Sequence, residues 1–503
     1  MDFLGIDVGT SGCKTTAFSH EGEVLSFAYE EYDIQRTNPG WAELDASAVW
    51  RSVKRTIAGT INGHPDPASI LALSVSSMAE AVVPVSRDRQ ILAPSILNFD
   101  SRGEEYLPEI QTLIDDKDLF TINGNPSGNI YTLTKLLWLR DKSPDIYEQA
   151  DYFLHWSGFV LFMLGGEAKT DFSLANRTLL FDLSEEDWSE SLINTFKIER
   201  SKLPAITPSA KPVGTISSHI ASELGLSKDV MLVSGAHDQC ANAVGCGVVE
   251  DGQAAYGMGT YHCITPVYSK LQPAGMMLDR GLNIEHHAVP GKYVSFIYNP
   301  GGALVKWYRD TFAHEEHQQA IKAGSGIYEK LISEITDDAS PVLVLPHFAP
   351  TGPPDFVTDS SGVIVGLRLE TTRADVLQGI LEGTAFYLKE CMDSLPPTSF
   401  HVENFRVAGG GSRSDRWVQV CADIFERPFI RLEVTEAGTL GAAVMAGVGI
   451  GFFSSIQESA GAMVQTERTF EPDKQRAGQH KCRYEAYKKL WPMMSQYLRS
   501  LPN

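Results

Sequence analysis

The sequence lacks the cysteine spacing of a disulfide framework or a zinc site. Its seven cysteines are scattered along the chain and odd in number, and no two of them stand in a CxxC pair. This pattern argues against both kinds of site. It also fits a protein that works in a reducing compartment, and we therefore expect the cytoplasm.

Basic clusters and long apolar runs are also missing. The net charge is −21, with no basic cluster to offset it, which argues against a nucleic-acid partner. The most apolar stretch, Leu440–Phe453, is too short and too rich in glycine to span a membrane, so it predicts a buried, closely packed helix. Asp2 stands where a secretory signal would need basic residues.

The length of 503 residues exceeds what one hydrophobic core supports, and it predicts two large domains, or three. The first half reads as strand, strand, strand, helix and strand, with Asp45 capping the helix. No GxGxxG segment follows a strand, so a dinucleotide-binding fold is not expected. We further expect helices at Asp151–Leu164, Thr372–Cys391 and Tyr484–Leu501, and a strand at Met231–Ser234.

The opening segment Phe3–Phe18 reads as a strand, a turn and a second strand. Its turn, Gly9-Thr10-Ser11-Gly12, offers unobstructed backbone N–H groups and two hydroxyls, which is what a phosphate chain requires of a loop. Lys14 stands close enough along the chain to reach an anion held there. The alternative is an ordinary β-hairpin with glycines at positive φ.

A second copy of this turn favours the phosphate interpretation. The segment from Val8 to Thr15 recurs as Met258 to Thr265, with Gly, Thr, Cys and Thr in register. Internal repeats reveal architecture, so we expect two related domains that each present a Gly-Thr turn to one shared cleft.

Two acids, Asp7 and Asp238, each end a predicted buried strand beside a glycine-containing turn. Transfer of a phosphoryl group from ATP needs a Mg²⁺ ion and a group that accepts the proton of the attacking hydroxyl. One carboxylate could hold the metal and the other could act as the base. Helix capping or a salt bridge is the alternative for either acid. Gly409-Gly410-Gly411, followed by Ser412 and a helix, is the best nucleotide candidate of the second half, and Gly301-Gly302 is a weaker one.

Several motifs resemble those of the FGGY carbohydrate kinases, in matching order along nearly the whole chain. These motifs are GIDVGTSGCK, SGAHDQ, GMGT, SGVIVGLRLETTRADVLQGILEG and GGGSRSDRWVQVCADIFERP. The resemblance implies an α/β fold of two actin-like (ribonuclease-H-like) domains, with ATP and Mg²⁺ in the cleft between them. We place the sugar-binding domain at 1–235 and the domain with most of the nucleotide site at 236–503.

Carried over by motif, Asp238 is similar to the family's general base, Asp7 to the carboxylate near magnesium, and Asp238 is a second candidate metal ligand. The nucleotide candidates, from the turns and from the motifs, are Gly9, Thr10, Ser11, Lys14, Gly259, Thr260, Gly302, Gly409, Gly410, Gly411 and Ser412. The substrate candidates are Met78, Ala79, Glu80, Asp238 and Gln239.

The departures from the family pattern bear on the substrate. Met78-Ala79-Glu80 stands where xylulokinases show Gln-Met-His and glycerol kinases Gln-Arg-Glu, and Ile130 replaces a glycerol-kinase Tyr, so glycerol is disfavoured. Glu80 could accept hydrogen bonds from sugar hydroxyls; the alternative is a surface acid. The segment SLANRTLLFDL resembles that of xylulokinases.

We therefore expect an ATP-dependent kinase of a small sugar, with a ketose such as xylulose or ribulose favoured. Gluconate and a polyol such as a tetritol remain open, and an actin-like ATPase switch is the rival from another class. The oligomeric state also stays open, with a homodimer as one alternative.

Overall fold

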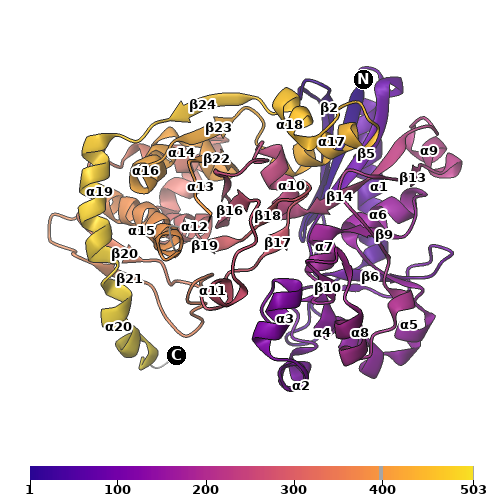
Figure 1. The fold of residues 1–503 in the computed structure, drawn as a ribbon. Helices are drawn as coiled ribbons and strands as arrows, with labels where there is room; N and C mark the ends of the chain where they lie inside the picture. The colour runs from indigo at the N-terminus through magenta and orange to yellow at the C-terminus, as the bar shows by residue number, and fades with distance from the viewer. Residues whose placement is uncertain (396–399, 502–503) are drawn as a thin grey trace.

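The computed structural model describes residues 1–395 and 400–501. Two β-sheets organise it, one in each half of the chain (Figure 1). The first has the order β13-β14-β5-β1-β2-β3 and the second β17-β18-β16-β15-β22-β23-β24, with β19 paired to β16. The strands of the first sheet are β1 (Asp2–Val8), β2 (Gly12–Ser19), β3 (Val24–Glu31), β5 (Ile70–Ser77), β13 (Pro212–Thr215) and β14 (Met231–His237). Those of the second are β15 (Gln253–Met258), β16 (Tyr261–Tyr268), β17 (Glu285–His286), β18 (Tyr293–Val294), β19 (Ile297–Pro300), β22 (Asn404–Ala408), β23 (Phe429–Leu432) and β24 (Thr466–Phe470).

The two sheets share one topology. In the first, β3, β2 and β1 are antiparallel neighbours, and β5 and β14 continue in parallel. In the second, β19, β16 and β15 are antiparallel neighbours, and β22 and β23 continue in parallel. The repeated Gly-Thr turn thus joins the corresponding strands, β1 to β2 and β15 to β16. The predicted pair of related halves is confirmed, whereas the boundary near residue 235 stays a prediction.

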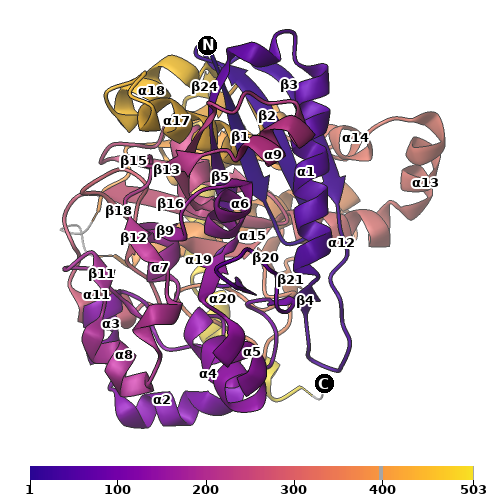
Figure 2. The ribbon, with the colours of Figure 1, turned by 90° about the vertical axis from the view of Figure 1, so that its right-hand side faces the viewer.

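Helices cover both faces of the first sheet. α1 (Ala46–Gly63) begins at Asp45, whose carboxylate accepts hydrogen bonds from the backbone N–H groups of Ser47 and Ala48, as predicted. α1 and α6 (Trp156–Leu164) lie on the face that Figure 2 turns toward the viewer. The other face is covered by α17 (Ala437–Gly449), which comes from the far end of the chain.

Glycines allow α17 to approach its neighbours closely. A Cβ atom at Gly5 of β1 would lie 1.7 Å from the carbonyl oxygen of Thr439 in α17. A Cβ at Gly441 would lie 1.9 Å from the carbonyl oxygen of Ala241 in α10 (Asp238–Gly245), so only hydrogen fits there. The predicted buried, closely packed helix at Leu440–Phe453 is confirmed, although it ends at Gly449.

The remaining elements surround these two layers, and Figure 1 labels most of them. In the first half they are β4 (Glu43–Leu44), β6 (Val82–Val85), β7 (Ser95–Ile96), α2 (Leu107–Leu113), α3 (Asp116–Asn123), α4 (Thr132–Lys142), α5 (Pro144–Gln149), β8 (Tyr152–His155), β9 (Lys169–Asp171), α7 (Phe172–Asn176), β10 (Phe181–Asp182), β11 (Asp187–Trp188), α8 (Glu190–Phe196), β12 (Ala205–Thr207) and α9 (Ser218–Leu224). In the second half they are α11 (Ala274–Leu278), α12 (Gly302–Phe312), α13 (His314–Ala323), α14 (Ile327–Ser333), β20 (Leu343–Leu345), β21 (Val363–Val365), α15 (Arg373–Asp393), α16 (Asp415–Phe425), α18 (Ile456–Met463), α19 (Lys474–Tyr487) and α20 (Leu490–Arg499).

Two helix predictions were wrong in part. Asp151–Leu164 contains the strand β8 before α6, because Tyr152–His155 pairs with β6. Tyr484–Leu501 is not one helix, since α19 ends at Tyr487 and α20 begins at Leu490. Across the described part of the chain, no helix has the length and apolar character needed to cross a membrane.

Candidate active site

Asp7 and Asp238 meet at one edge of the first sheet. Asp7 lies in β1 opposite Ser76 of β5, whose hydroxyl donates a hydrogen bond of 2.8 Å to Asp7 Oδ1. On the other side of β5, His237 of β14 lies opposite Ser77, and Asp238 follows it as the first residue of α10. The parallel register of β1, β5 and β14 therefore carries both acids to the same end of the sheet.

Burial makes Asp7 hard to ionise. Desolvation raises the pKa of Asp7 to about 6, and the negative charge of Asp238 contributes in the same direction. Ser76 and Lys14 oppose this effect only in part. A divalent cation bound by both carboxylates would offset the charge that burial and Asp238 disfavour on Asp7. The residues present therefore fit a magnesium ion.

The first Gly-Thr turn is held by hydrogen bonds at its base, and its tip is accessible to solvent. The backbone N–H of Gly9 donates to the carbonyl of Gly12 at 3.0 Å. The Tyr32 hydroxyl donates to the carbonyls of Gly9 and Gly12, at 2.5 and 3.1 Å. Ser11 at the tip is exposed and Thr10 is half-buried. The turn thus uses the backbone N–H of Gly9 to keep its shape, whereas the Thr10 and Ser11 hydroxyls take no part in these bonds.

Lys14 does not point to a vacant anion site, because it already has a partner. Its Nζ lies 2.6 Å from Oε2 of Glu436, the residue that precedes α17. Burial lowers the pKa of Lys14, but the hydrogen bond to Glu436 together with the charges of Glu436 and Asp7 outweighs that effect, so the pKa is raised overall. This ion pair joins the two halves of the chain.

The nucleotide candidates of the second half lie together. The carbonyls of Gly259 and Thr260 accept hydrogen bonds of 3.0–3.1 Å from the backbone N–H groups of Gly301, Gly302 and Ala303, where α12 begins. A Cβ at Gly302 would lie 2.5 Å from the Gly259 carbonyl oxygen, so glycine is required for this approach.

The glycine triplet lies against the same hairpin. Gly409 has φ +90° and Gly411 lies beside Met258, which directly precedes Gly259, while nothing lies within 4 Å of a Cβ built on Gly410. The hydroxyl of Ser412 donates to the Gly409 carbonyl at 2.7 Å and so closes this turn.

The substrate candidates Met78, Ala79 and Glu80 form a buried loop after β5. Glu80 is 5% exposed and has φ +62°, so it is not a surface acid. Its Oε1 accepts hydrogen bonds from Nε and Nη2 of Arg177 at 2.7 and 2.5 Å, and its Oε2 accepts one from Asn98 at 3.3 Å. The loop therefore comes with an arginine that we did not predict.

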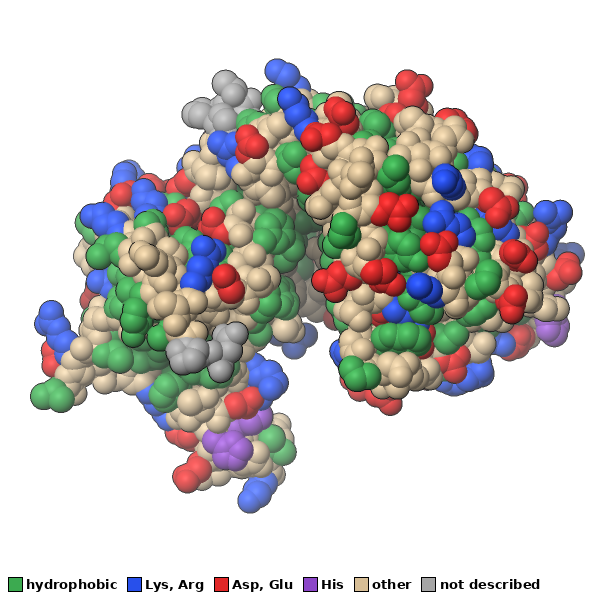
Figure 3. All heavy atoms as spheres, turned by 90° about the horizontal axis from the view of Figure 1, so that it is seen from below, with side chains coloured by type: hydrophobic (Ala, Val, Ile, Leu, Met, Phe, Trp, Pro, Cys, Tyr) green, Lys and Arg blue, Asp and Glu red, His purple; other side chains and the backbone are tan. Residues whose placement is uncertain are grey.

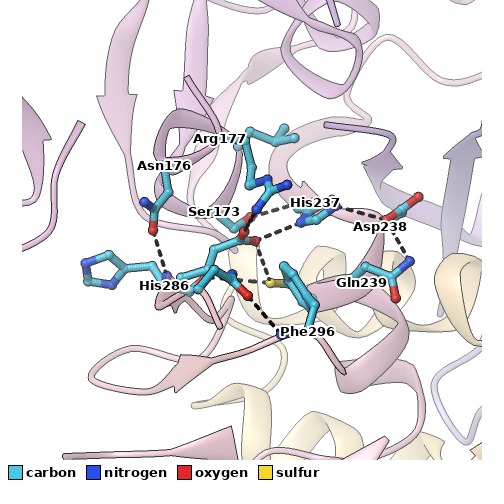
Figure 4. A network of polar contacts seen from close by, with 12 residues as sticks. Ser173, Asn176, Arg177, His237, Asp238, Gln239, His286 and Phe296 are labelled. Carbon is cyan, nitrogen blue, oxygen red and sulfur yellow. Dashed lines mark hydrogen bonds and ion pairs between the residues drawn. The ribbon is translucent and has the colours of Figure 1, made fainter. Parts of the chain in front are cut away.

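Arg177 begins a buried chain of alternating charges that ends at Asp238 (Figure 4). Its Nη1 lies 3.6 Å from Oε2 of Glu285, and Glu285 Oε1 lies 2.7 Å from Nδ1 of His237. His237 Nε2 lies 3.1 Å from Asp238 Oδ1. Burial opposes protonation of His237, but the charge of Glu285 and the hydrogen bond to Asp238 outweigh it, so its pKa lies well above the usual range.

His237, Cys240 and Glu285 also have the residue types of a metal site, since their ligand atoms lie within 4.8 Å of one another. However, Cys240 Sγ donates to Glu285 at 3.4 Å, and burial raises the pKa of that thiol to about 12. Because Arg177 and His237 already offset the charge of Glu285, we assign this group to the polar network instead of to a metal.

The acids, the substrate loop and the first turn belong to the first half, whereas Glu285, Phe296 and the other glycine turns belong to the second. A deep groove separates the two halves when the molecule is seen from below (Figure 3). Contacts between the halves include Arg177 to Glu285, His237 to the Phe296 ring at 5.3 Å, and Lys14 to Glu436. An arrangement with donors on both sides suits a phosphate chain held between two halves.

Two family models match the chain. The N-terminal domain of the FGGY family of carbohydrate kinases matches residues 3–245, and the C-terminal domain of that family matches residues 284–450. The chain is similar to a xylulose kinase of Staphylococcus epidermidis, with 27% identity over 99% of this chain and 98% of the relative. It is 30% identical to a glycerol kinase of Janthinobacterium sp. over 93% of this chain and 94% of the relative.

Comparison with solved structures agrees with the family models. A crystal structure of a "xyloylose kinase" from Brucella ovis superposes with a TM-score of 0.87 and 23% identity, covering 99% of this chain and 100% of the other. This likeness confirms the predicted fold of two actin-like domains. The family models, supported by these relatives, show that the chain belongs to the FGGY family of carbohydrate kinases and is an ATP-dependent sugar kinase.

Proposed function

We propose that the protein phosphorylates a hydroxyl of a small, uncharged ketose, with xylulose or ribulose as the substrate. The observation that carries this choice is the state of Arg177, the cation beside the substrate loop. Its guanidinium lies against the carboxylates of Glu80 and Glu285. These two carboxylates already neutralise its positive charge, so it does not favour the binding of a sugar carboxylate. A substrate such as gluconate would have to displace one of these partners inside a buried network, which is costly.

The other buried cations of this region are also occupied. Arg102 pairs with Asp100 and Glu43, both at 2.6 Å, and Lys135 donates to the backbone carbonyls of Asp100 and Arg102 at 2.9 and 2.7 Å. Neutral hydroxyls, in contrast, can share hydrogen bonds with Glu80 and Asn98 without separating an ion pair. The pocket chemistry therefore favours an uncharged sugar over an aldonate.

In this proposal Asp238 is the general base. Its Oδ1 accepts hydrogen bonds from His237 and Gln239, each at 3.1 Å, and we find no protein donor to its Oδ2 within 1–395 and 400–501. That oxygen is therefore available to take the proton of the attacking hydroxyl. The backbone N–H groups of the turns at Gly9–Ser11, Gly259–Thr260 and Gly409–Gly411 would position the phosphates. When bound, Mg²⁺ would offset phosphate charge, and Asp7 and Asp238 would hold it directly or through water.

The test combines one variant with a substrate panel. Asp238→Asn is expected to lower turnover by on the order of 10²-fold or more and to leave nucleotide binding near normal. Asp229→Asn, an exposed acid outside the site, is the matched control. Rates of ADP formation are measured with xylulose, ribulose, gluconate, glycerol and a tetritol. Near-normal turnover of Asp238→Asn would remove the base assignment.

The panel also separates the rivals. A higher kcat/KM for gluconate than for either ketose would contradict the proposed substrate class. ATP consumption that no sugar or polyol increases would favour an actin-like ATPase switch. Light scattering of the same preparation tests whether the protein is a homodimer, the alternative that the sequence left open.

A further inference from the structure

We propose that His237, held in place by Glu285, is a positioning residue for Asp238. This inference rests on the proposed function, in which Asp238 is the base. His237 is the last residue of β14 and Asp238 is the first residue of α10, so the two side chains leave the chain where strand becomes helix.

Both nitrogens of the His237 ring are engaged. Nδ1 lies 2.7 Å from Glu285 Oε1, and Nε2 lies 3.1 Å from Asp238 Oδ1. Ionised carboxylates only accept hydrogen bonds, so each nitrogen donates and the ring bridges the two acids. Charge-assisted hydrogen bonds of this kind have strong directional preference, which suits them to fix the orientation of a side chain.

Glu285 is itself immobilised. Its side chain is fully buried, Cys240 Sγ donates to it at 3.4 Å, and Arg177 lies 3.6 Å from its second oxygen. The edge of the His237 ring also meets Phe296, with the ring planes at 89°. The imidazole cannot turn away from Asp238 without breaking a buried ion pair, which carries a large penalty.

The consequence falls on the geometry of Asp238. His237 and Gln239 both bind Oδ1, which leaves Oδ2 of Asp238 outside the network of dashed contacts (Figure 4). Without the bridge, Gln239 alone would restrain a carboxylate that is 30% exposed. Because a displacement of about 1 Å can lower a rate by about 10²-fold, such a loss of restraint is expected to reduce turnover.

A pair of amide variants tests this. The amide of Gln reaches the place of Nε2, so His237→Gln keeps a donor for Asp238, whereas the shorter His237→Asn reaches only the place of Nδ1. We expect His237→Asn to lower kcat by about 10–100-fold, and His237→Gln to restore most of this loss. The sugar Kd and the melting temperature of the two variants are expected to agree, because both lose the same charge.

A double-mutant cycle completes the test. If His237 acts through Asp238, then His237→Asn adds no further loss of kcat in the Asp238→Asn background. An inactive Asp238→Asn together with a fully active His237→Asn would overturn the positioning role and leave the proposed function intact. An active Asp238→Asn would instead overturn the proposed function itself.

Glu285→Gln keeps the test decisive if the His237 variants fail to fold. Gln has the same shape as Glu and its amide oxygen can still accept from Nδ1, but the anchoring charge is gone. We expect a lower kcat with an unchanged sugar Kd. An unchanged kcat in folded Glu285→Gln would overturn the inference.

Discussion

At the residue scale, the ionised form of Asp7 lowers the stability of the folded protein, although the candidate site uses this carboxylate. Its pKa is raised to about 6, chiefly by burial, so the native state holds that proton more tightly than the unfolded chain does. Stability is then highest when Asp7 is protonated, and it falls as the pH rises from about 4 to about 6. The loss is on the order of 3 kcal/mol at neutral pH.

Asp7→Asn is therefore expected to raise the free energy of unfolding at pH 7.5 and to lower turnover by on the order of 10²-fold. The gain in stability should shrink as the pH approaches 4, where Asp7 of the parent protein is protonated. Urea unfolding at several pH values checks this. A gain that is independent of pH would show that Asp7 does not carry the raised pKa.

Glu382 provides a comparison away from the site. It is fully buried in α15, and its Oε1 accepts hydrogen bonds from the Ser340 N–H at 2.8 Å and from Gln378 at 3.0 Å. Desolvation raises its pKa to about 7, against an ordinary value of 4.5. Ionisation of Glu382 thus removes stability as the pH rises through this range.

We expect Glu382→Gln to stabilise the protein at pH 8 relative to pH 5, by on the order of 2–3 kcal/mol, with kcat unchanged. The amide oxygen can keep both hydrogen bonds. Parallel melting curves of the parent and the variant measure the difference. A variant that loses stability at both pH values would instead indicate that the hydrogen bonds, not the charge, dominate.

At the element scale, the contact between α10 and α17 depends on glycine. Gly441→Ala would place a methyl group 1.9 Å from the Ala241 carbonyl oxygen, so the two helices must separate. We expect a loss of several kcal/mol, beyond the usual range of about 1–3 kcal/mol for overpacking. Thermal unfolding measures it.

Gly461→Ala is the matched control within α18, where nothing lies within 4 Å of the added Cβ. Alanine is the better helix former, so a gain of up to about 1 kcal/mol is expected. Equal effects of the two substitutions would mean that the close approach of α10 and α17 does not matter.

Sequence patterns predicted the helices, strands and turns better than they predicted the buried polar network around Asp238. The Asp45 cap and the duplicated turn are local signals, and the structure confirms both of them. The break between α19 and α20 was missed although Pro492, which lacks a backbone N–H and is tolerated only near a helix start, stands in the first turn of α20.

The buried ion pairs that run from Arg177 to Asp238 could not be predicted from the local sequence around each residue. Arg177 and Glu80 are 97 positions apart, and His237 and Glu285 are 48 apart, so only the fold brings them together. Their residue types alone do not distinguish a buried partner from a surface charge. The candidate acids were predictable because each stands at the end of a strand, whereas their supporting partners were not.

At the scale of the whole molecule, the phosphate-binding candidates belong to different halves. The turn at Gly9–Ser11 belongs to the first half and the turns at Gly259–Thr260 and Gly409–Gly411 to the second. A nucleotide that contacts both sets should draw the halves together and exclude water from the reacting groups.

We therefore expect a non-hydrolysable ATP analogue and a ketose together to reduce the radius of gyration in X-ray scattering. At about 100 times its Kd, each ligand should add about 2.7 kcal/mol to the free energy of unfolding. The same experiment with Asp229→Asn should give the parent result. Stabilisation without compaction would indicate that the halves are already closed in the free protein.

The contact of α17 with the first sheet also constrains how the protein is made. Phe3, Phe18 and Val233 lie on the sheet face that α17 covers. During translation this apolar surface has no cover until Gly449 has left the ribosome, roughly tens of seconds after β14. A fragment that stops before Ala437 would keep that surface exposed to chaperones and to other chains. The two halves thus have separate sheets but depend on each other for maturation.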